Sequence, residues 1–432
     1  MKLASLSTDQ APPIFIPLRF FAVAPLFMIL AALLLATSNG NPFSDIHSPA
    51  LLAATHCITL GFVAMTMLGA IQQILPVMIG STMPAPAPVA WLTLLSLTLG
   101  TLLLSSGFML GKAELLNLAW PLLGLTFLVF IGASLVSLTR AAARNVTKAA
   151  VLLALFALTG AITLGALLAR GYATGLALDY LRLAAAHISL ALGGWVMLLI
   201  VGVSYQVVPM FQITPPYPKR LTETLAPAIF AVLLINLAIL LLEPASRWPG
   251  FIAESLFWLL SGCFAVVTLR LQNQRKRRIA DATLSFFQLG MFSLLLAALF
   301  SLASFIPSTA FAQPRLLSAI AFLLGFAMSL IQGMLYKIIP FLVWFHLFRG
   351  GPSATKVGIP NVKEVIPERW MWRHLWLHGA TILAALLASG WDAAVWLLAL
   401  GLLLQGLLLG YAVFTGIAVY RRTLRKIEQA SR

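Results

Sequence analysis

Histidines offer the clearest chemistry in this sequence, because its long apolar stretches contain almost no carboxylates. His56 and His187 each lie about seven residues into a predicted helix, and a rise of about 1.5 Å per residue places both ~10 Å below the same end. Neutral imidazole is a ligand for heme iron and for copper. Two histidines at one depth on facing helices predict a heme held between them. The alternative is two buried histidines bonded to neighbouring hydroxyls or carbonyls.

A second group of histidines consists of His346, His374 and His378. The last two are four residues apart, which places them on one helix face at metal-ligand spacing. His374 and His378 follow the segment 369–373, which is rich in Trp and Arg. This composition is equally typical of a belt at the membrane surface. The group therefore predicts either such a belt or a second metal or heme site. His47 falls in a predicted loop and is expected to be solvated.

Two arginines lie close to His187 in the sequence. Arg182 precedes it by five residues, and Arg170 ends the preceding apolar stretch. If a heme is bound, these guanidinium groups are expected to bind its propionates through charge-assisted hydrogen bonds. As purely structural residues, both would extend their charged ends toward the membrane surface.

A pattern of two glycines and a proline occurs three times and locates these histidines in the chain. In each copy, the second Gly is at position i+8 from the first, and the Pro is at position i+7 from the second Gly. A fixed period with constant internal spacing indicates a repeated structural unit. The copies are Gly61, Gly69 and Pro76; Gly194, Gly202 and Pro209; and Gly325, Gly333 and Pro340.

The two histidines are not at equivalent positions in this repeat. Counted back from the Pro of its own copy, His56 is at position −20, whereas His187 is at position −22. A difference of two residues turns a side chain by about 200° on an α-helix. A bulge before one of the prolines would remove this difference, but the sequence shows no sign of one. The third copy has Ser318 and Ile320 at these positions, and thus no histidine.

Composition shows what kind of element positions these residues. The chain has 432 residues, of which 61% are hydrophobic and 9% charged, and its mean hydropathy is +0.98. Such values, with apolar runs long enough to cross a bilayer, predict an all-α polytopic membrane protein. Twelve transmembrane helices are expected at 15–36, 48–79, 87–109, 113–138, 149–169, 180–211, 222–242, 248–270, 281–305, 315–348, 370–390 and 392–420.

The repeat predicts three parallel four-helix units within a single membrane domain, 1–432. The repeated stretches fall in the second, sixth and tenth helices, and an even number of helices per unit keeps the units parallel. By helix order the units are 15–138, 149–270 and 281–420. Of the 28 Lys and Arg, 22 fall at one side, which predicts that both termini are cytoplasmic in a bacterial-type plasma membrane. The net charge of +16 follows from this topology and does not indicate a nucleic-acid partner.

Few other charged residues occur inside the predicted helices, although Ser and Thr are plentiful. No Asp or Glu lies near the middle of a helix, which argues against a proton relay and most cation-coupled transport. Lys337 takes the place of Gln73 and Gln206 in the third copy of the repeat. These three side chains are expected to bond the backbone carbonyls that the prolines leave free.

The helix count, the units and the phrases HCITLGFVAMTMLGAIQQILPVMIG and HISLALGGWVMLLIVGVSYQVVPMF together resemble subunit I of the heme–copper oxidase and nitric oxide reductase superfamily. They are also similar to the NnrS family of heme- and copper-containing membrane proteins. The resemblance implies His56 as an axial heme ligand, with His187 a candidate by position. The tenth and seventh helices lack the histidines of the superfamily, so an oxygen-reducing dinuclear centre is not expected.

These observations lead to two classes of function. The first is a heme b-binding membrane protein that transfers electrons or binds nitric oxide or another small ligand without pumping protons. It would be a redox protein rather than an oxygen-reducing oxidase, with copper as a possible second metal and a cytochrome c-like protein as a possible electron donor. The alternative is a cofactor-free channel or permease for a small molecule, or an accessory subunit that has lost its cofactors.

Overall fold

The computed structural model describes residues 11–141, 145–242, 248–276, 279–306, 313–349 and 357–430. Among these residues, eleven helices are long and apolar enough to cross a membrane. A twelfth long helix, α16 (Glu368–Ala388), is less apolar because its first turns carry Arg369, Arg373, His374 and His378. The protein is therefore an all-α polytopic membrane protein, as the composition predicts.

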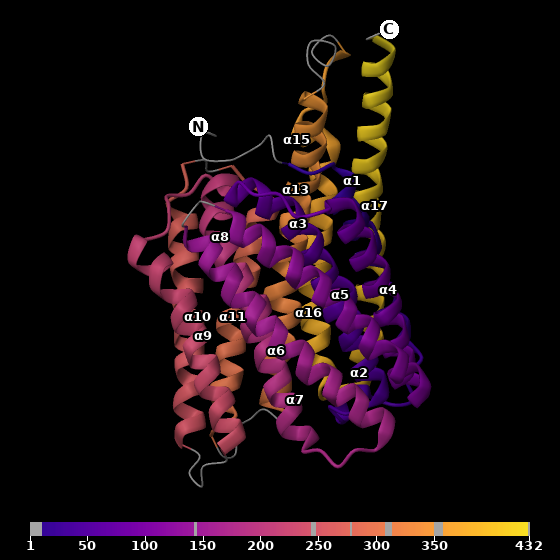
Figure 1. Cartoon of the computed structure of the whole chain (residues 1–432), viewed down its shortest axis with the longest axis vertical. Helices are drawn as coiled ribbons and strands as arrows, with labels where there is room; N and C mark the ends of the chain where they lie inside the picture. Colours follow the sequence, from indigo (N-terminus) through magenta and orange to yellow (C-terminus); the bar gives the residue numbers. More distant parts are fainter. Residues whose placement is uncertain are drawn as a thin grey trace.

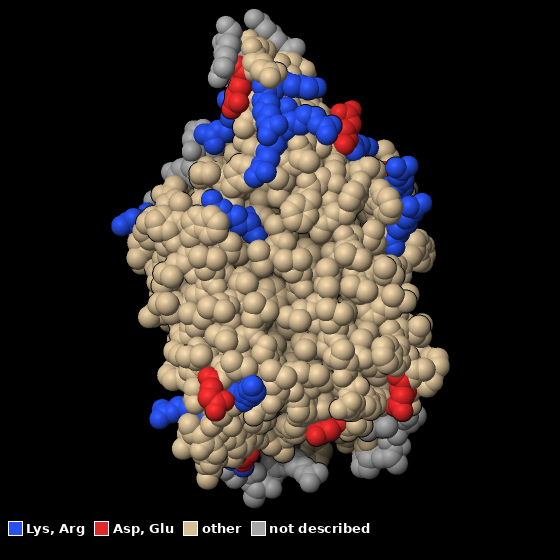
Figure 2. Space-filling model, turned by 90° about the vertical axis from the view of Figure 1, so that its right-hand side faces the viewer, with Lys and Arg blue, Asp and Glu red and all other residues tan. Residues whose placement is uncertain are grey.

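The helices run roughly parallel to the long axis of the molecule (Figure 1). The surface in Figure 2 carries Lys and Arg mainly at the upper end, and a wide band without charged residues separates this end from the lower one. Such a band is what a bilayer requires of a protein surface. The undivided helices of the four-helix units, besides α16, are α1 (Phe15–Ala36), α4 (Pro86–Leu110), α5 (Ala113–Arg140), α6 (Val146–Thr174), α9 (Lys219–Leu242), α10 (Trp248–Asn273), α11 (Ala282–Ala303) and α17 (Asp392–Ala430).

The second, sixth and tenth spans are each divided by a π-helical segment of 8 residues. The segments begin at Cys57, Ser189 and Ala321, so they are evenly spaced along the chain. The spans are α2 (Pro49–His56), η3 (Cys57–Ala64) and α3 (Met65–Ile79); α7 (Tyr180–Ile188), η4 (Ser189–Val196) and α8 (Met197–Gln212); and α12 (Pro314–Ile320), η5 (Ala321–Met328) and α13 (Ser329–Phe348).

The packing of the helices repeats three times around the molecule. In each unit the first helix packs on the divided span and the third helix packs on the fourth. The fourth helix then packs on the first helix of the next unit, as in α5 against α6 and α10 against α11. Contact between α17 and α1 closes the ring. The divided spans are the most buried, with 67%, 61% and 78% of their apolar windows inside the protein, so they form the core.

The repeated glycines serve this packing. A Cβ at any of the six would lie 2.1–2.7 Å from a side-chain atom of the first helix in the same unit. Real Cβ atoms do not come so close, and only glycine allows these backbones to approach. The glycines therefore join the divided span to its neighbour. The pairs are Gly61 with Phe27, Gly69 with Phe20, Gly194 with Ala157, Gly202 with Ala150, Gly325 with Ser293, and Gly333 with Phe286.

Candidate functional site

His56 and His187 line the same cavity, which has a volume of about 340 Å³. The cavity lies near the ends of α2 and α7, at the lower end of the bundle in Figure 1. Walls also come from α4, α5, α6, α12 and α17. The structure thus brings together two histidines that belong to different four-helix units.

The imidazole of His56 is held by its own helix. Its Nδ1 lies 2.8 Å from the carbonyl oxygen of Leu52, one turn earlier. One face of the ring packs on Phe108, with the ring centroids 5.4 Å apart. Because His56 is the last residue of α2, this contact fixes the ring where the helix changes to its π-helical segment.

The imidazole of His187 is held by a neighbouring helix. Its Nδ1 lies 2.8 Å from the carbonyl oxygen of Ala161 in α6. Gly165, one turn further along α6, makes room for the ring, because a Cβ there would lie 2.9 Å from Cε1 of His187. The first helix of the second unit therefore supplies both the hydrogen-bond acceptor and the space.

These two hydrogen bonds determine which nitrogen of each ring is free. A carbonyl oxygen only accepts hydrogen bonds, so Nδ1 must carry the proton in both histidines. In a neutral ring, Nε2 then keeps its lone pair. Metal-binding histidines commonly donate their other ring nitrogen to a carbonyl in this way, which fixes the ring and increases its basicity. The geometry therefore suits both side chains for metal ligation through Nε2.

The cavity wall is otherwise largely apolar and aromatic. Leu, Ile, Val and Ala side chains predominate, together with Trp120, Phe127 and Trp195. Trp195 is only 3% exposed, and its indole N–H has no hydrogen-bond partner among the described residues. A buried donor without a partner is uncommon in native proteins. Trp195 follows Gly194 of the sequence repeat, but the repeat gave no sign that this tryptophan would line the histidine cavity.

The π-helical segments do not remove the offset between the two histidines. All three spans contain such a segment, so each span gains the same extra turn. His56 directly precedes η3, and one residue, Ile188, separates His187 from η4. The two positions therefore differ by one residue when counted from the segments, and still by two when counted from the repeated glycines and prolines.

The two arginines do not reach the cavity. In the described part of the chain, neither Arg170 nor Arg182 belongs to its lining. The guanidinium of Arg182 lies 3.2 Å from the carboxylate of Asp179, and Arg170 is exposed. By contrast, His47 is exposed, as expected, and also lines the cavity. The predicted contact of the arginines with propionates has no support in this arrangement.

His374 and His378 lie in a buried network between α13, α16 and α17. They are 0% and 1% exposed, whereas Trp376 between them is 74% exposed. A surface belt therefore describes the tryptophan but not the two histidines. The hydrogen bonds join Tyr336 Oη to His374 Nδ1 at 2.8 Å, Ser329 Oγ to His378 Nε2 at 2.9 Å, and His378 Nδ1 to Gln405 Oε1 at 2.8 Å.

The amide of Gln405 determines the protonation of His378. Its Nε2 donates to Thr381 Oγ1 at 2.7 Å, so its Oε1 must accept from His378 Nδ1. The Nε2 of His378 then accepts from the hydroxyl of Ser329. Both nitrogens of His378 are thus engaged. Of the four ring nitrogens in this pair, only Nε2 of His374 is without a partner among the described residues.

His346 lies apart from this network. Its two ring nitrogens are 3.0 Å from the carbonyl oxygen of Leu342 and 3.1 Å from that of Pro12. Within the described ranges, no three His, Cys, Asp or Glu side chains come together as a metal site. The structure does not bring His346 to His374 and His378.

Two of the three side chains before the repeated prolines contact the start of the first helix of their own unit. Lys337 Nζ lies 2.7 Å from Asp281 Oδ2, and Gln206 Nε2 donates to Thr147 Oγ1 at 3.2 Å. For these two residues the contacts replace the predicted bonds to free carbonyls, whereas Gln73 Oε1 has no partner among the described residues. Burial acts to raise the pKa of Asp281, but the hydrogen bond and the charge of Lys337, with bonds from Thr283, outweigh it and lower that pKa.

Two comparisons with known proteins found no relative of this chain. No protein-family model matches the sequence, and no curated protein matches it significantly. Interpretation of the site therefore depends on its own residues.

Proposed function

We propose that the protein is a heme b-binding integral membrane protein in which His56 and His187 are the iron ligands. One observation carries this proposal: two partly buried imidazoles line one cavity, and each donates Nδ1–H to a carbonyl, so that Nε2 is without a hydrogen-bond partner among the described residues. Histidine is a common axial ligand of heme iron, and the apolar, aromatic wall suits a porphyrin. The sequence resemblance to the heme–copper oxidase superfamily supports the same assignment.

The side chains around the cavity have separate tasks in this proposal. The carbonyls of Leu52 and Ala161 orient the rings and hold a proton on Nδ1, which leaves the lone pair of a neutral ring on Nε2, where a metal would bind. Apolar residues exclude water, which would tune the redox potential of the iron. A bound heme would supply one-electron chemistry or a site for a small gaseous ligand.

The number of histidines that bind the iron decides between electron transfer and the binding of a small gaseous ligand. With both histidines as ligands the site suits electron transfer, whereas ligation by His56 alone would leave a position for nitric oxide or a similar molecule. In the bilayer of a bacterial-type plasma membrane, with cytoplasmic termini, a cytochrome c-like protein would be a suitable electron donor. Copper bound by the same pair is the other metal that these ligands favour.

The test is the visible spectrum of the protein purified in detergent from heme-replete cells. The expected result is a Soret band, with α and β bands that sharpen on reduction by dithionite. His56→Ala should abolish or shift these bands, and His187→Ala should do the same if both residues are ligands. His346→Ala is the control, because it removes a histidine that lies outside the lining of this cavity, and it should leave the spectrum unchanged.

Metal analysis of the same samples separates iron from copper. The proposal expects iron in proportion to protein, and loss of that iron with His56→Ala. A folded, colourless wild-type protein would contradict it, as would a spectrum that neither cavity variant alters. Copper without iron would assign the same residues to a different metal.

A further inference from the structure

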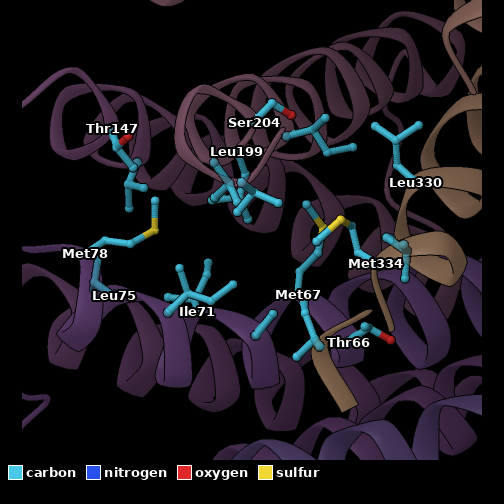
Figure 3. A pocket seen from close by; sticks show the side chains of 18 of the residues that line it. Thr66, Met67, Ile71, Leu75, Met78, Thr147, Leu199, Ser204, Leu330 and Met334 are labelled. Carbon is cyan, nitrogen blue, oxygen red and sulfur yellow. The ribbon is translucent and has the colours of Figure 1, made fainter. Parts of the chain in front are cut away.

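A second cavity lies at the centre of the molecule, between the three divided spans. Its volume is about 110 Å³. The wall consists mainly of residues from α3, α8 and α13, the helices that carry the repeated prolines. Figure 3 shows Ile71 and Leu199 on opposite sides of this space, with Met67 and Met334 close to each other at one end and Met78 at the other.

The wall of this central cavity selects against polar and charged molecules. Leu, Ile, Val, Ala, Phe and Met side chains make up most of it, and no described charged residue takes part. Hydroxyl groups come only from Thr66, Thr147 and Ser204 among the described residues. That of Thr147 already donates to the carbonyl of Gly202 at 2.9 Å. The hydroxyl of Thr66 has no partner among the described residues, but so few hydroxyl groups would not replace the hydration of an ion or a sugar.

The size of the central cavity limits its occupant to a few atoms. An apolar cavity of about 150 Å³ in another protein stays dry and binds benzene or xenon. A smaller space of the same character suits a diatomic or triatomic gas or a single xenon atom. Such a molecule gains contacts with the surrounding side chains and gives up little hydration.

The two cavities lie one after the other along the same three spans. Val63 lines the histidine cavity, and Met67, four residues later, lines the central one. In the same way, Val196 lines the first and Ile200 the second. Four residues are about one helical turn, so a molecule in the central cavity would be about one turn from the wall of the histidine cavity.

We propose that the central cavity binds a small, uncharged, apolar molecule of the size of dioxygen or nitric oxide. Binding depends on the shape and apolar character of the wall and would occur without heme. If the proposed heme is present, the cavity would hold a gaseous ligand beside it. The two proposals can therefore fail independently.

Xenon is a suitable probe, because it is apolar, chemically inert and strongly scattering. Crystals of the full-length protein pressurised with xenon should show an anomalous peak between Ile71 and Leu199. Leu199→Phe fills the space and should abolish this peak. Leu95→Phe is the matched control, because it makes the same substitution on a residue that is 60% exposed, and it should leave the peak unchanged.

Leu199→Ala tests the same idea in the opposite direction. It enlarges the cavity and should strengthen the xenon peak, and it keeps the experiment decisive if the Phe variant does not fold. The absence of a central peak in both the wild type and Leu199→Ala would overturn the proposal. So would a wild-type peak that Leu199→Phe leaves in place.

Discussion

Two pairs of histidines are held inside this protein, and they differ in the surroundings of their ring nitrogens. His56 and His187 line a cavity, and each has one ring nitrogen bonded to a carbonyl and the other without a hydrogen-bond partner in the described part of the chain. His374 and His378 are bound to side chains of neighbouring helices, and both nitrogens of His378 are occupied. The first pair is therefore available to a ligand, whereas the second holds helices together.

The comparison shows that spacing in the sequence is a weak guide to the role of a histidine. His374 and His378 have the i, i+4 spacing of many metal ligands, yet their bonds to Ser329, Tyr336 and Gln405 make them part of a packed network. Of the ring nitrogens of these two histidines, Nε2 of His374 alone has no partner among the described residues and would be left for a metal.

The largest effect is expected when the network is broken. His378→Leu would leave the hydroxyl of Ser329 and the amide of Gln405 without this partner in the interior. We expect a loss of about 2–4 kcal/mol in the free energy of unfolding, because buried polar groups lose their bonds and the packing changes. His56→Leu breaks one bond within its own helix and should cost about 1 kcal/mol.

Unfolding of the cofactor-free protein in a denaturing detergent series would measure both values. His47→Leu provides the control for removal of an exposed histidine. Equal losses for His378→Leu and His56→Leu would remove the distinction between a structural pair and an available pair.

A smaller effect is expected on heme affinity when a side chain is placed against the imidazole of His187. Gly165→Ala places a methyl group 2.9 Å from Cε1 of His187, so the ring must move away from its position. We expect heme affinity to fall by about tenfold, a typical result of disturbing the orientation of a metal ligand. Heme titration of the apo protein would measure this change.

Gly262→Ala is a suitable control for the titration. Its Cβ would be 3.6 Å from the nearest atom, an ordinary contact distance, in a helix that does not line the histidine cavity within the described ranges. An unchanged affinity for Gly165→Ala would indicate that the position of the His187 ring does not matter for binding.

The smallest effect concerns a charged pair in the same unit as the network. Burial acts to raise the pKa of Asp281 in the folded protein, but the bonds and charge of Lys337 outweigh it, so the pKa is lowered. A lowered pKa stabilises the fold above the pKa of the unfolded chain, and this stability is lost as the pH falls through the folded value. Stability should therefore decrease by roughly 1 kcal/mol as the pH falls below about 4.

Asp281→Asn should remove this part of the pH dependence. Thermal unfolding at pH 7 and at lower pH would compare the variant with the wild type. Asp179→Asn, which alters an exposed ion pair with Arg182, is the control. A wild-type pH profile in Asp281→Asn would show that the pair with Lys337 contributes no pH-dependent stability.

Much of the fold could be predicted because a membrane imposes long apolar helices. The repeat of Gly61, Gly69 and Pro76 located the spans that form the core, although the role of its glycines became clear only from their contacts with α1, α6 and α11. The apolar stretch that ends near residue 420 also misses the end of α17, which continues to Ala430 beyond the apolar band.

The site could be predicted only in part. Depth along the helices placed His56 and His187 together, but the direction of each ring depends on acceptors such as the carbonyl of Ala161, which belongs to a different helix from His187. The π-helical segments have no residue signature of their own, because a change from i−4 to i−5 bonding depends on packing. For the same reason, the sequence did not separate the buried His374 from the exposed Trp376.

The π-helical segments make the spans tolerant of a small change in chain length. Each segment accommodates more residues per turn than an α-helix does. Deleting one residue from η3 (Cys57–Ala64) would allow the span to rewind as an α-helix, with Gly69 and Pro76 still packed in place. Because the rewound segment turns more per residue, His56 would rotate by much less than the about 100° that the same deletion causes in a purely α-helical span. A one-residue change inside the segment is therefore largely absorbed there, whereas the same change between η3 and Gly69 would turn His56 away from the cavity.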